Sequence, residues 1–168
     1  NVYLGLLHRL DRPAGGVMVF ARTSKAAARL SEAIRKGEVE KTYFAVLQKK
    51  PAKDKGELLN YMIKDEKTNI SRIVEQNEPG AKEARLAYEV LSQKDKLTLV
   101  KIRLFTGRSH QIRVQFAAIG CPLMGDMRYG KSAEKQQLAL WSHCLIFEHP
   151  VQKEKITVTS DPPECYPW

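Results

Sequence analysis

Cysteine is scarce in this sequence, and the few cysteines are not arranged for a disulfide framework or a metal site. There are three of them in 168 residues, and no two have the spacing of a CxxC motif: Cys121, Cys144 and Cys165. An odd number of widely separated cysteines argues against a disulfide scaffold and a zinc site, and is typical of the reducing cytoplasm. His143 and His149 flank an apolar segment and are interpreted as ordinary residues rather than metal ligands. We therefore expect a cytoplasmic protein without a bound metal.

Long hydrophobic runs and cofactor motifs are also missing. No apolar run approaches the roughly 20 residues that a membrane-spanning helix needs. The apolar fraction is 43%, which is typical of a globular protein rather than a disordered one. No motif for a nucleotide or another cofactor is present. The expected protein is globular and needs no cofactor.

Positive charge, by contrast, is plentiful. Lysine and arginine number 28 against 19 acidic residues, which gives a net charge of +9 and a pI near 9.5. This balance fits the electrostatic footprint of nucleic-acid binding, although a basic but otherwise ordinary surface explains it equally well. The length suits one domain, residues 1–168, with a sizeable core.

Apolar patterning predicts an α+β domain in which strands outnumber helices. One helix is expected to begin after the N-cap residues Thr23 and Ser24 and to end at Gly37. A second, short helix is expected after the turn at 106–109. The first expected strand, at 17–21, reads as buried on both faces. The other strands are expected at residues 42–47, 84–90, 100–104, 138–147 and 156–160.

The polar segments 48–57 and 64–82 break this pattern and are interpreted as solvated loops that a nucleic acid could contact. Because strands and helices do not alternate, we expect a mixed, mostly antiparallel sheet with a few flanking helices.

The segment HRLDRPAGG (8–16) is the first of three segments that could carry chemistry. It places Asp11 between Arg9 and Arg12, shortly before two glycines that permit unusual backbone angles and close approach of another molecule. An aspartate beside guanidinium groups stays ionised and can act as a base or nucleophile. On this segment alone, however, a turn cap or structural ion pair is the more frequent role for Asp11.

The second segment, TGRSHQIR (106–113), turns into a helix. Its exposed N–H groups would suit a phosphate, and Arg108, His110 and Arg113 add donors around them. Arg113 lies beside the apolar face of the helix, where an arginine usually needs a carboxylate partner. A capped helix with solvated basic side chains is an equally good interpretation.

The third segment, KTYFAVL (41–47), places Tyr43 on a strand. A tyrosine there can stack on a nucleic-acid base. More often, a strand tyrosine belongs to the packed core. Taken residue by residue, the three segments indicate RNA binding moderately and catalysis weakly.

Together, these segments resemble a known family. HRLDRPAGGVMVFAR, KTYFAVL, TGRSHQIRVQFAAIGCPLMGD with the following RYG, and the tail DPPECYPW occur in the order found in the RluA-type pseudouridine synthases. The resemblance spans the chain from His8 to Trp168. HRLD followed by glycine, combined with GRSHQIR further along, is far more specific than either motif alone. The resemblance implies the pseudouridine synthase fold with a central RNA-binding cleft.

The resemblance also implies roles for individual residues. Asp11 matches the aspartate on which catalysis depends. Tyr43 matches the tyrosine that stacks on the target base and is thought to help remove the C5 proton. Arg113 matches the basic residue that pairs with the aspartate. Further polar residues of the two motifs are expected to bind the substrate: Arg9, Arg108, His110 and Gln111.

The implied reaction isomerises chosen uridines in structured RNA, ribosomal or transfer RNA, without a metal or cofactor. The N1–C1′ bond breaks, the uracil rotates in its pocket, and C5 bonds to C1′. The uridine must be flipped out of a duplex or lie in a loop, and Arg9 could fill the space that it leaves. Attack on C1′, addition to the uracil ring and removal of the 2′ proton all remain open as the role of Asp11. The alternative function is an RNA-binding module on the same scaffold that does not catalyse.

The sequence departs from the family pattern in two ways. Gly15-Gly16 replaces the usual Ser-Gly after HRLD, and the loss of this hydroxyl is expected to loosen the loop. The chain begins at Asn1, whereas the family's catalytic domain normally starts some tens of residues earlier. We therefore expect that an N-terminal part of the domain is missing, and that a sheet edge or core face is exposed or covered by another molecule.

Overall fold

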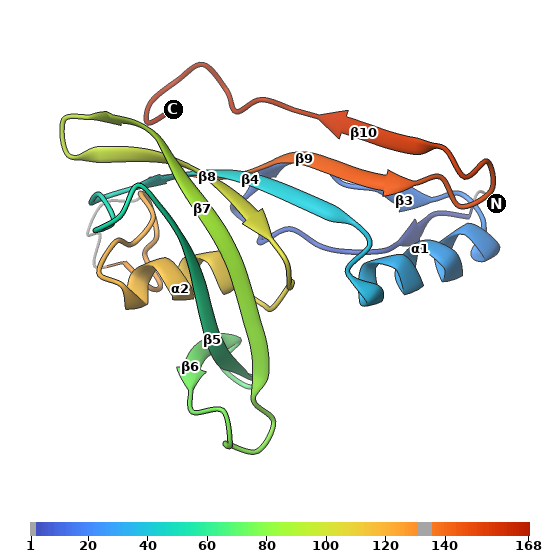
Figure 1. Cartoon of the computed structure of the whole chain (residues 1–168), viewed down its shortest axis with the longest axis horizontal. Coiled ribbons are helices and arrows are strands. Elements are labelled where there is room, and N and C mark those ends of the chain that lie inside the picture. Colours follow the sequence, from blue (N-terminus) through green and yellow to red (C-terminus); the bar gives the residue numbers. More distant parts are fainter. Residues whose placement is uncertain (1–2, 131–135) are drawn as a thin grey trace.

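The protein is described here from a computed structural model, which covers residues 3–130 and 136–168. Its main feature is an eight-stranded sheet in the order β10-β9-β4-β8-β7-β5-β6, with β2 paired to β9 (Figure 1). All pairings are antiparallel except that of β2 with β9. The strands are β2 (Gly15–Gly16), β4 (Glu40–Leu47), β5 (Lys55–Asp65), β6 (Ile70–Val74), β7 (Lys82–Lys94), β8 (Leu97–Leu104), β9 (Leu140–Glu148) and β10 (Lys155–Thr159).

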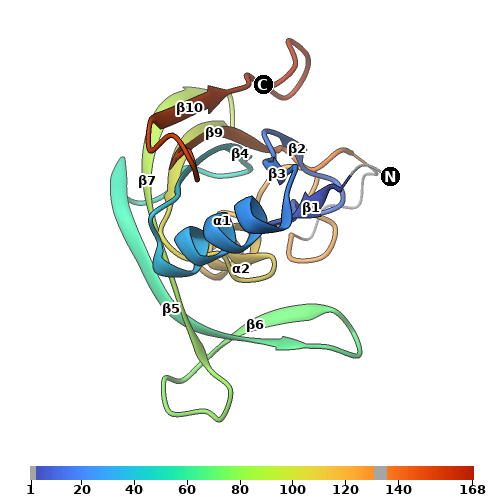
Figure 2. The ribbon, with the colours of Figure 1, turned by 90° about the vertical axis from the view of Figure 1, so that its right-hand side faces the viewer.

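Two helices, α1 (Ser24–Lys36) and α2 (Gln111–Ala118), cover the same face of this sheet. Figure 2 shows the sheet curving around both of them. The mostly antiparallel α+β architecture expected from the sequence is confirmed.

The ends of both helices lie where the sequence predicts them. The hydroxyl of Thr23 accepts a hydrogen bond from the Ala26 N–H at 3.1 Å, and Gly37 ends α1 in the left-handed conformation (φ 76°). A side-chain oxygen at the N-cap satisfies an N–H group that has no partner within the helix, and glycine adopts positive φ without a steric penalty. Gly120 follows α2 with φ 74°.

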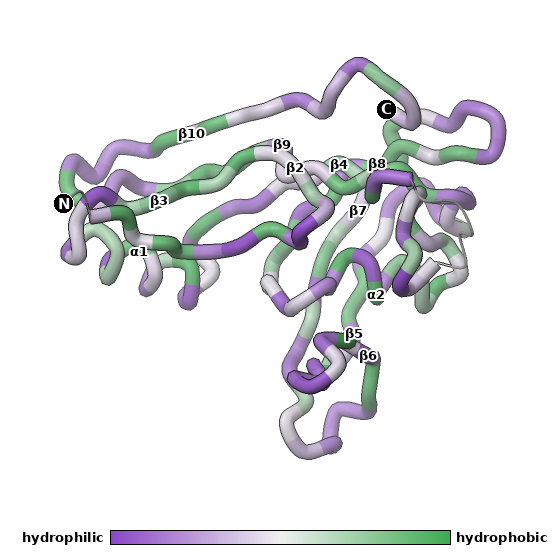
Figure 3. Tube along the Cα trace, turned by 180° about the vertical axis from the view of Figure 1, so that it is seen from behind, coloured by the Kyte–Doolittle hydropathy of each residue, from purple (hydrophilic) through white to green (hydrophobic). Residues whose placement is uncertain are grey.

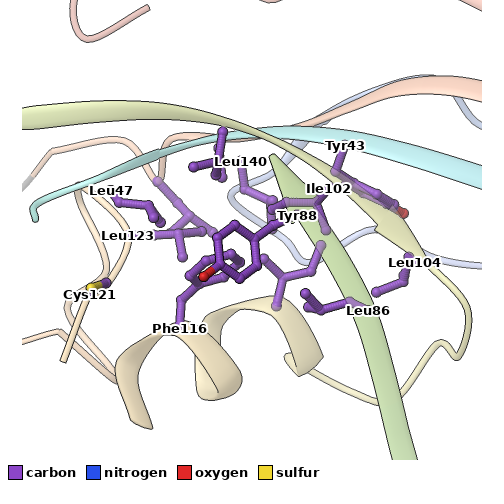
Figure 4. Close-up of a cluster of buried hydrophobic side chains, with 14 residues drawn as sticks. Tyr43, Leu47, Leu86, Tyr88, Ile102, Leu104, Phe116, Cys121, Leu123 and Leu140 are labelled. Atoms are coloured by element: carbon purple, nitrogen blue, oxygen red, sulfur yellow. The ribbon is translucent and has the colours of Figure 1, made fainter. Parts of the chain in front are cut away.

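The main core lies between the sheet and α2 (Figure 4). Alternate residues of β4, β7 and β8 face Phe116 of α2, which is fully buried. A smaller cluster packs α1 against β9 through Leu30, Leu145 and Phe147. The same sheet thus packs against α2 in one cluster and against α1 in the other.

The predicted strand at 17–21 is wrong in most of its length. Only Phe20–Ala21 is a strand (β3), and it pairs with β1 (Gly5–Leu6) in a separate two-stranded sheet. Phe20 is 42% exposed, so the segment is not buried on both faces. The N–H of Val19 donates to Nε2 of His8 at 3.1 Å, so a side chain takes the place of a neighbouring strand.

The predicted loops at 48–57 and 64–82 are only partly loops. β5 begins at Lys55, and β6 lies inside the second segment. Together with β7 they extend from the rest of the sheet as an arm, which we define as residues 60–84 (Figure 1) and which packs on α2 through Met62 and Ala84. Hydrophilic residues predominate between β5 and β6 (Figure 3). In β5 the apolar residues Tyr61, Met62 and Ile63 follow one another, so the alternation that reveals a half-buried strand is absent.

Apolar side chains are exposed on the two-stranded sheet and just before it. Leu4, Leu6 and Phe20 are 64%, 56% and 42% exposed. The expectation that a further segment or another molecule covers a face of the domain stays a prediction. Among the described residues, neither helix is long and apolar enough to cross a membrane.

Candidate active site

A cleft of about 930 Å³ opens between α1, the N-terminal loop and the turn before α2. Its charge is strongly asymmetric. Among the described residues that line it, Asp11 is the one acidic residue. Seven lysines and arginines line the same cleft: Arg9, Arg12, Arg35, Lys36, Lys41, Lys64 and Arg108. A concave surface with this balance favours a polyanionic ligand.

Asp11 lies on a turn closed by the Ala14 N–H, which donates to the Asp11 carbonyl at 2.8 Å. Its side chain is 20% exposed. Nη1 of Arg113 donates to Oδ2 of Asp11 at 3.3 Å, and Nε2 of His110 lies 4.0 Å from Oδ1. The structure thus brings together Asp11 and Arg113, which are 102 residues apart in the sequence, as the sequence predicts.

Arg113 has a second and closer carboxylate partner. Its Nε and Nη2 donate to the two oxygens of Asp126 at 2.9 and 2.8 Å. Asp126 is fully buried, and its Oδ1 also accepts from the N–H groups of Arg128 and Tyr129. Burial opposes the charge of Asp126, but the hydrogen bonds from Arg113 and the backbone outweigh it and hold the pKa of Asp126 below its ordinary value. Asp126 therefore fixes the guanidinium that faces Asp11.

Sequence reasoning missed this role of Asp126. The sequence did show that Arg113 needs a carboxylate, and Asp11 was taken to supply it alone. One guanidinium has five N–H donors, so it can serve two carboxylates. The Asp in the MGD segment before RYG was the available indication of the second one.

Tyr43 belongs to both the core and the cleft. The residue is only 8% exposed and packs in the main cluster, yet it also lines the cleft. Its hydroxyl points away from the cluster in Figure 4. Burial raises the pKa of Tyr43, the charge of Asp11 raises it further, and a hydrogen bond with Ser142 partly offsets both. The phenol is therefore protonated at neutral pH, and its ring gives the cleft an apolar wall.

The turn before α2 is held by Gln111. Its Oε1 accepts from the Arg108 N–H at 2.9 Å and from the Thr106 hydroxyl at 2.8 Å. Its Nε2 donates to the Arg85 carbonyl and to Gln115. Gln111 is buried and uses its amide within the protein, so it shapes the cleft; the predicted substrate contact of Gln111 stays a prediction.

Arg9, Arg108 and His110 also lie in the cleft lining. Nε of Arg108 donates to the Glu83 carbonyl at 2.7 Å, which ties this side chain to the arm. Their substrate contacts stay predictions. Within the described residues, no three His, Cys, Asp or Glu side chains form a group suited to a metal ion.

Lys41 is a further cleft residue that sequence reasoning did not single out. It is half-buried, and no carboxylate of the described residues lies within ion-pair distance of its Nζ. Burial and the nearby charge of Arg108 lower the pKa of Lys41. A partly desolvated ammonium group without an acidic partner is placed to bind an anion.

Comparison with known proteins decides the family. The model of the RNA pseudouridylate synthase family matches residues 1–118. The chain belongs to this family. Its relatives include ribosomal large subunit pseudouridine synthases C, which places it among the RluA-type enzymes that its motifs resemble.

Two curated relatives illustrate the degree of similarity. An uncharacterized RNA pseudouridine synthase of Aquifex aeolicus is 34% identical over 174 residues, covering 96% of this chain and 54% of the relative. Ribosomal large subunit pseudouridine synthase C of Rickettsia bellii is 38% identical over 126 residues, covering 74% and 42%. The chain thus spans about half the length of these relatives.

A solved structure confirms the fold. Human RNA pseudouridylate synthase domain containing 4 superposes with a TM-score of 0.81 at 25% identity, covering 96% of this chain and 72% of the human chain. The expected pseudouridine synthase fold is therefore present.

The departure from the RluA-type pattern at Gly15 has a structural counterpart. A Cβ atom at Gly15 would lie 2.2 Å from Cζ3 of Trp141, so the indole ring occupies the space of the usual serine. The next residue, Gly16, has φ 112° and lies against the backbone of Ser142. The Val17 N–H donates to the Ser142 carbonyl at 2.8 Å. The loop is thus packed against β9, and the loosening expected from the loss of the hydroxyl stays a prediction.

We expect Gly15→Ser to lower the free energy of unfolding by about 1–3 kcal/mol, because the added atoms overlap the ring of Trp141. Chemical denaturation of the single variant and of the double variant with Trp141→Leu would measure this. The double variant should be the less affected by the serine. Equal stability of Gly15→Ser and wild type would show that the ring moves aside freely.

Proposed function

We propose that the protein converts chosen uridines of structured RNA into pseudouridine, with Asp11 as the catalytic carboxylate and without a cofactor. The observation that carries this proposal is the placement of Asp11. It is the one acidic residue among those described in the lining of a strongly basic cleft, and it is paired with Arg113.

In this proposal the charged residues of the cleft have two roles: the cations bind the RNA backbone, and Arg113 orients Asp11. The cationic lining suits the phosphates of an RNA strand, which supply affinity without reading the sequence directly. Asp11 would be repelled by the same phosphates if it stood alone. Its ion pair with Arg113 supplies a compensating positive charge and fixes the direction of the carboxylate, because Arg113 is itself held by Asp126.

For this reaction the cleft must hold an unstacked uridine while its uracil turns. The uridine leaves its stack so that the sugar can approach Asp11, and Arg9 would fill the vacated space. The N1–C1′ bond breaks, the uracil turns, C5 bonds to C1′, and the C5 proton is lost. Tyr43 would stack on the uracil while it turns, because its ring forms the wall of the cleft beside Asp11. The proposed substrate contacts of Arg108 and His110 lie on the opposite turn.

Ribosomal or transfer RNA is the proposed partner. The names of the relatives from Rickettsia bellii and Haemophilus ducreyi refer to the large ribosomal subunit, which favours ribosomal RNA as the first substrate to test. An enzyme for these RNAs would act in the cytoplasm.

Tritium release tests the activity. The full-length protein is incubated with unmodified RNA that carries tritium at C5 of uridine. We expect release of tritium into water with either ribosomal or transfer RNA. Binding of both RNAs without any release would instead support the inactive RNA-binding module.

We expect Lys41→Gln to weaken RNA binding and to reduce the salt dependence of the binding constant by about one phosphate contact. Filter binding over a range of salt concentrations measures both effects. Lys94→Gln, in an exposed residue at the end of β7, is the matched control and should retain the wild-type slope. Identical slopes for wild type and Lys41→Gln would remove Lys41 from the proposed phosphate contacts.

A further inference from the structure

His110 lies beside Asp11 with an unusual backbone conformation. Its φ is 55°, in the left-handed region, which few residues other than glycine adopt. This conformation turns its imidazole so that Nε2 lies 4.0 Å from Oδ1 of Asp11 and Nδ1 lies 2.7 Å from the hydroxyl oxygen of Tyr129. The ring therefore stands between the carboxylate and a tyrosine that the reaction does not otherwise use.

The partners of Tyr129 indicate which nitrogen of His110 carries the proton. The hydroxyl oxygen of Tyr129 accepts a hydrogen bond from the Ser71 N–H at 2.9 Å. Its own proton is then available, and Nδ1 of His110 is the acceptor within reach among the described residues. If the hydroxyl donates to Nδ1, the proton of a neutral imidazole must be on Nε2, the nitrogen that faces Asp11.

Tyr129 is itself fixed from three sides. Its N–H donates to Asp126, its ring lies 5.1 Å from the guanidinium carbon of Arg113, and Ser71 belongs to β6 of the arm. Nη1 of Arg128 donates to the Asn69 carbonyl at 2.7 Å, so two consecutive residues join this loop to the arm. The arm is thus connected, through the N–H of Ser71, to the hydroxyl that orients His110.

We propose that Tyr129 is a positioning residue that holds His110 with its Nε2–H directed at Asp11, so that the carboxylate is oriented on both oxygens. This inference rests on the proposed function of Asp11. Arg113 binds Oδ2, and His110 serves Oδ1. At 4.0 Å the second contact is longer than a hydrogen bond, and it shortens when the uridine fills the cleft.

The surroundings of His110 keep it neutral. Burial lowers the pKa of His110; Asp11 and Asp126 raise it, whereas Arg113 and Arg128 lower it, and the net effect is a lowered pKa. The hydrogen bond from Tyr129 can be accepted only by unprotonated Nδ1, so it lowers the pKa in the same direction. Removal of the hydroxyl must therefore raise the pKa of His110.

Tyr129→Phe is the direct test, because it keeps the ring over Arg113 and removes only the hydroxyl. In the full-length enzyme we expect kcat to fall about tenfold with little change in KM, as for the loss of one orienting hydrogen bond. The acidic limb of the kcat profile should move to higher pH. An unchanged kcat and an unchanged pH profile would overturn the proposal.

A double-mutant cycle separates positioning from a general structural effect. Once His110→Ala has removed the imidazole, Tyr129→Phe should cause no further loss of kcat. His110→Gln, which keeps an N–H donor near the position of Nε2, should restore part of the activity that His110→Ala loses. Equal losses from Tyr129→Phe with and without His110 would show that the hydroxyl acts elsewhere.

An NMR titration of His110 keeps this inference distinct from the proposed function, because it needs no RNA. We expect a higher pKa of His110 in Tyr129→Phe than in wild type. Absence of tritium release from wild type would defeat the proposed function, whereas an unchanged titration would defeat the link between Tyr129 and His110.

Discussion

Asp126→Ala is expected to lower the free energy of unfolding by about 3–5 kcal/mol, the usual cost of leaving a buried charge with its main partner removed. The guanidinium of Arg113 would lose both of its shorter hydrogen bonds and keep only the 3.3 Å contact with Asp11. The N–H groups of Arg128 and Tyr129 would lose their acceptor as well. Catalysis should fall too, because Arg113 is then free to swing away from Asp11.

Urea denaturation followed by circular dichroism measures this loss. Glu57→Ala is the matched control, since Glu57 also accepts from both ends of one guanidinium, that of Arg85, but both side chains are about half exposed. An exposed pair contributes about 0–1 kcal/mol. Similar losses from the two variants would mean that the buried pair is not the anchor of the site.

Lowering the pH should reduce the stability of the wild-type protein, as Asp126→Ala does, though in part only. Since the pKa of Asp126 is lowered in the folded protein, its charged form stabilises the fold above the ordinary value of 3.8. This contribution is lost as the pH falls from that value through the lowered pKa. The stability of Asp126→Ala should therefore fall less steeply than that of wild type over the same pH range.

Asp11→Asn is expected to reduce pseudouridine formation by about a thousandfold or more, because the substitution removes the one carboxylate among the described residues of the cleft. The fold should survive. Arg113 keeps its bidentate partner Asp126, so no buried charge is left unpaired. The contrast with Asp126→Ala follows from burial: Asp11 is 20% exposed and Asp126 is fully buried.

RNA binding should survive Asp11→Asn as well. The substitution removes a negative charge from a cleft of seven cations, so the RNA affinity should be equal to that of wild type or higher. Single-turnover formation of pseudouridine and filter binding measure the two quantities separately. Asp95→Asn, in the turn between β7 and β8 with φ 54°, is a suitable control because asparagine tolerates this conformation. A parallel loss of binding and activity in Asp11→Asn would point to misfolding or to a purely structural role.

The sequence predicted those elements whose determinants are local. Thr23 and Gly37 define α1 through their own hydroxyl group and left-handed backbone, and β4 and β8 alternate because one face meets the core. The strand expected at 17–21 is wrong because the N–H of Val17 donates to the backbone of Ser142 and that of Val19 to the side chain of His8, so no single strand pairs with the whole segment. The arm was missed because its apolar residues do not alternate with polar ones: Tyr61, Met62 and Ile63 follow one another, although Met62 and Ala84 are buried against Val114 of α2.

In the candidate site, too, one part could be predicted from the sequence and another could not. The need of Arg113 for a carboxylate could be read from its place beside the apolar face of α2, and Asp11 was correctly expected within reach. The second carboxylate, Asp126, and the link from Tyr129 to His110 depend on how the loop at 122–130 folds back over α2. That path is set by tertiary packing, so no local pattern specified it.

The central claim is that Asp11 in this cleft makes pseudouridine in cellular RNA. The most direct measurement maps pseudouridines in ribosomal and transfer RNA from cells that lack the gene and from the same cells carrying either wild type or Asp11→Asn. We predict that at least one pseudouridine disappears without the gene, returns with wild type, and does not return with Asp11→Asn. Restoration by Asp11→Asn, or an unchanged map after deletion, would contradict the account.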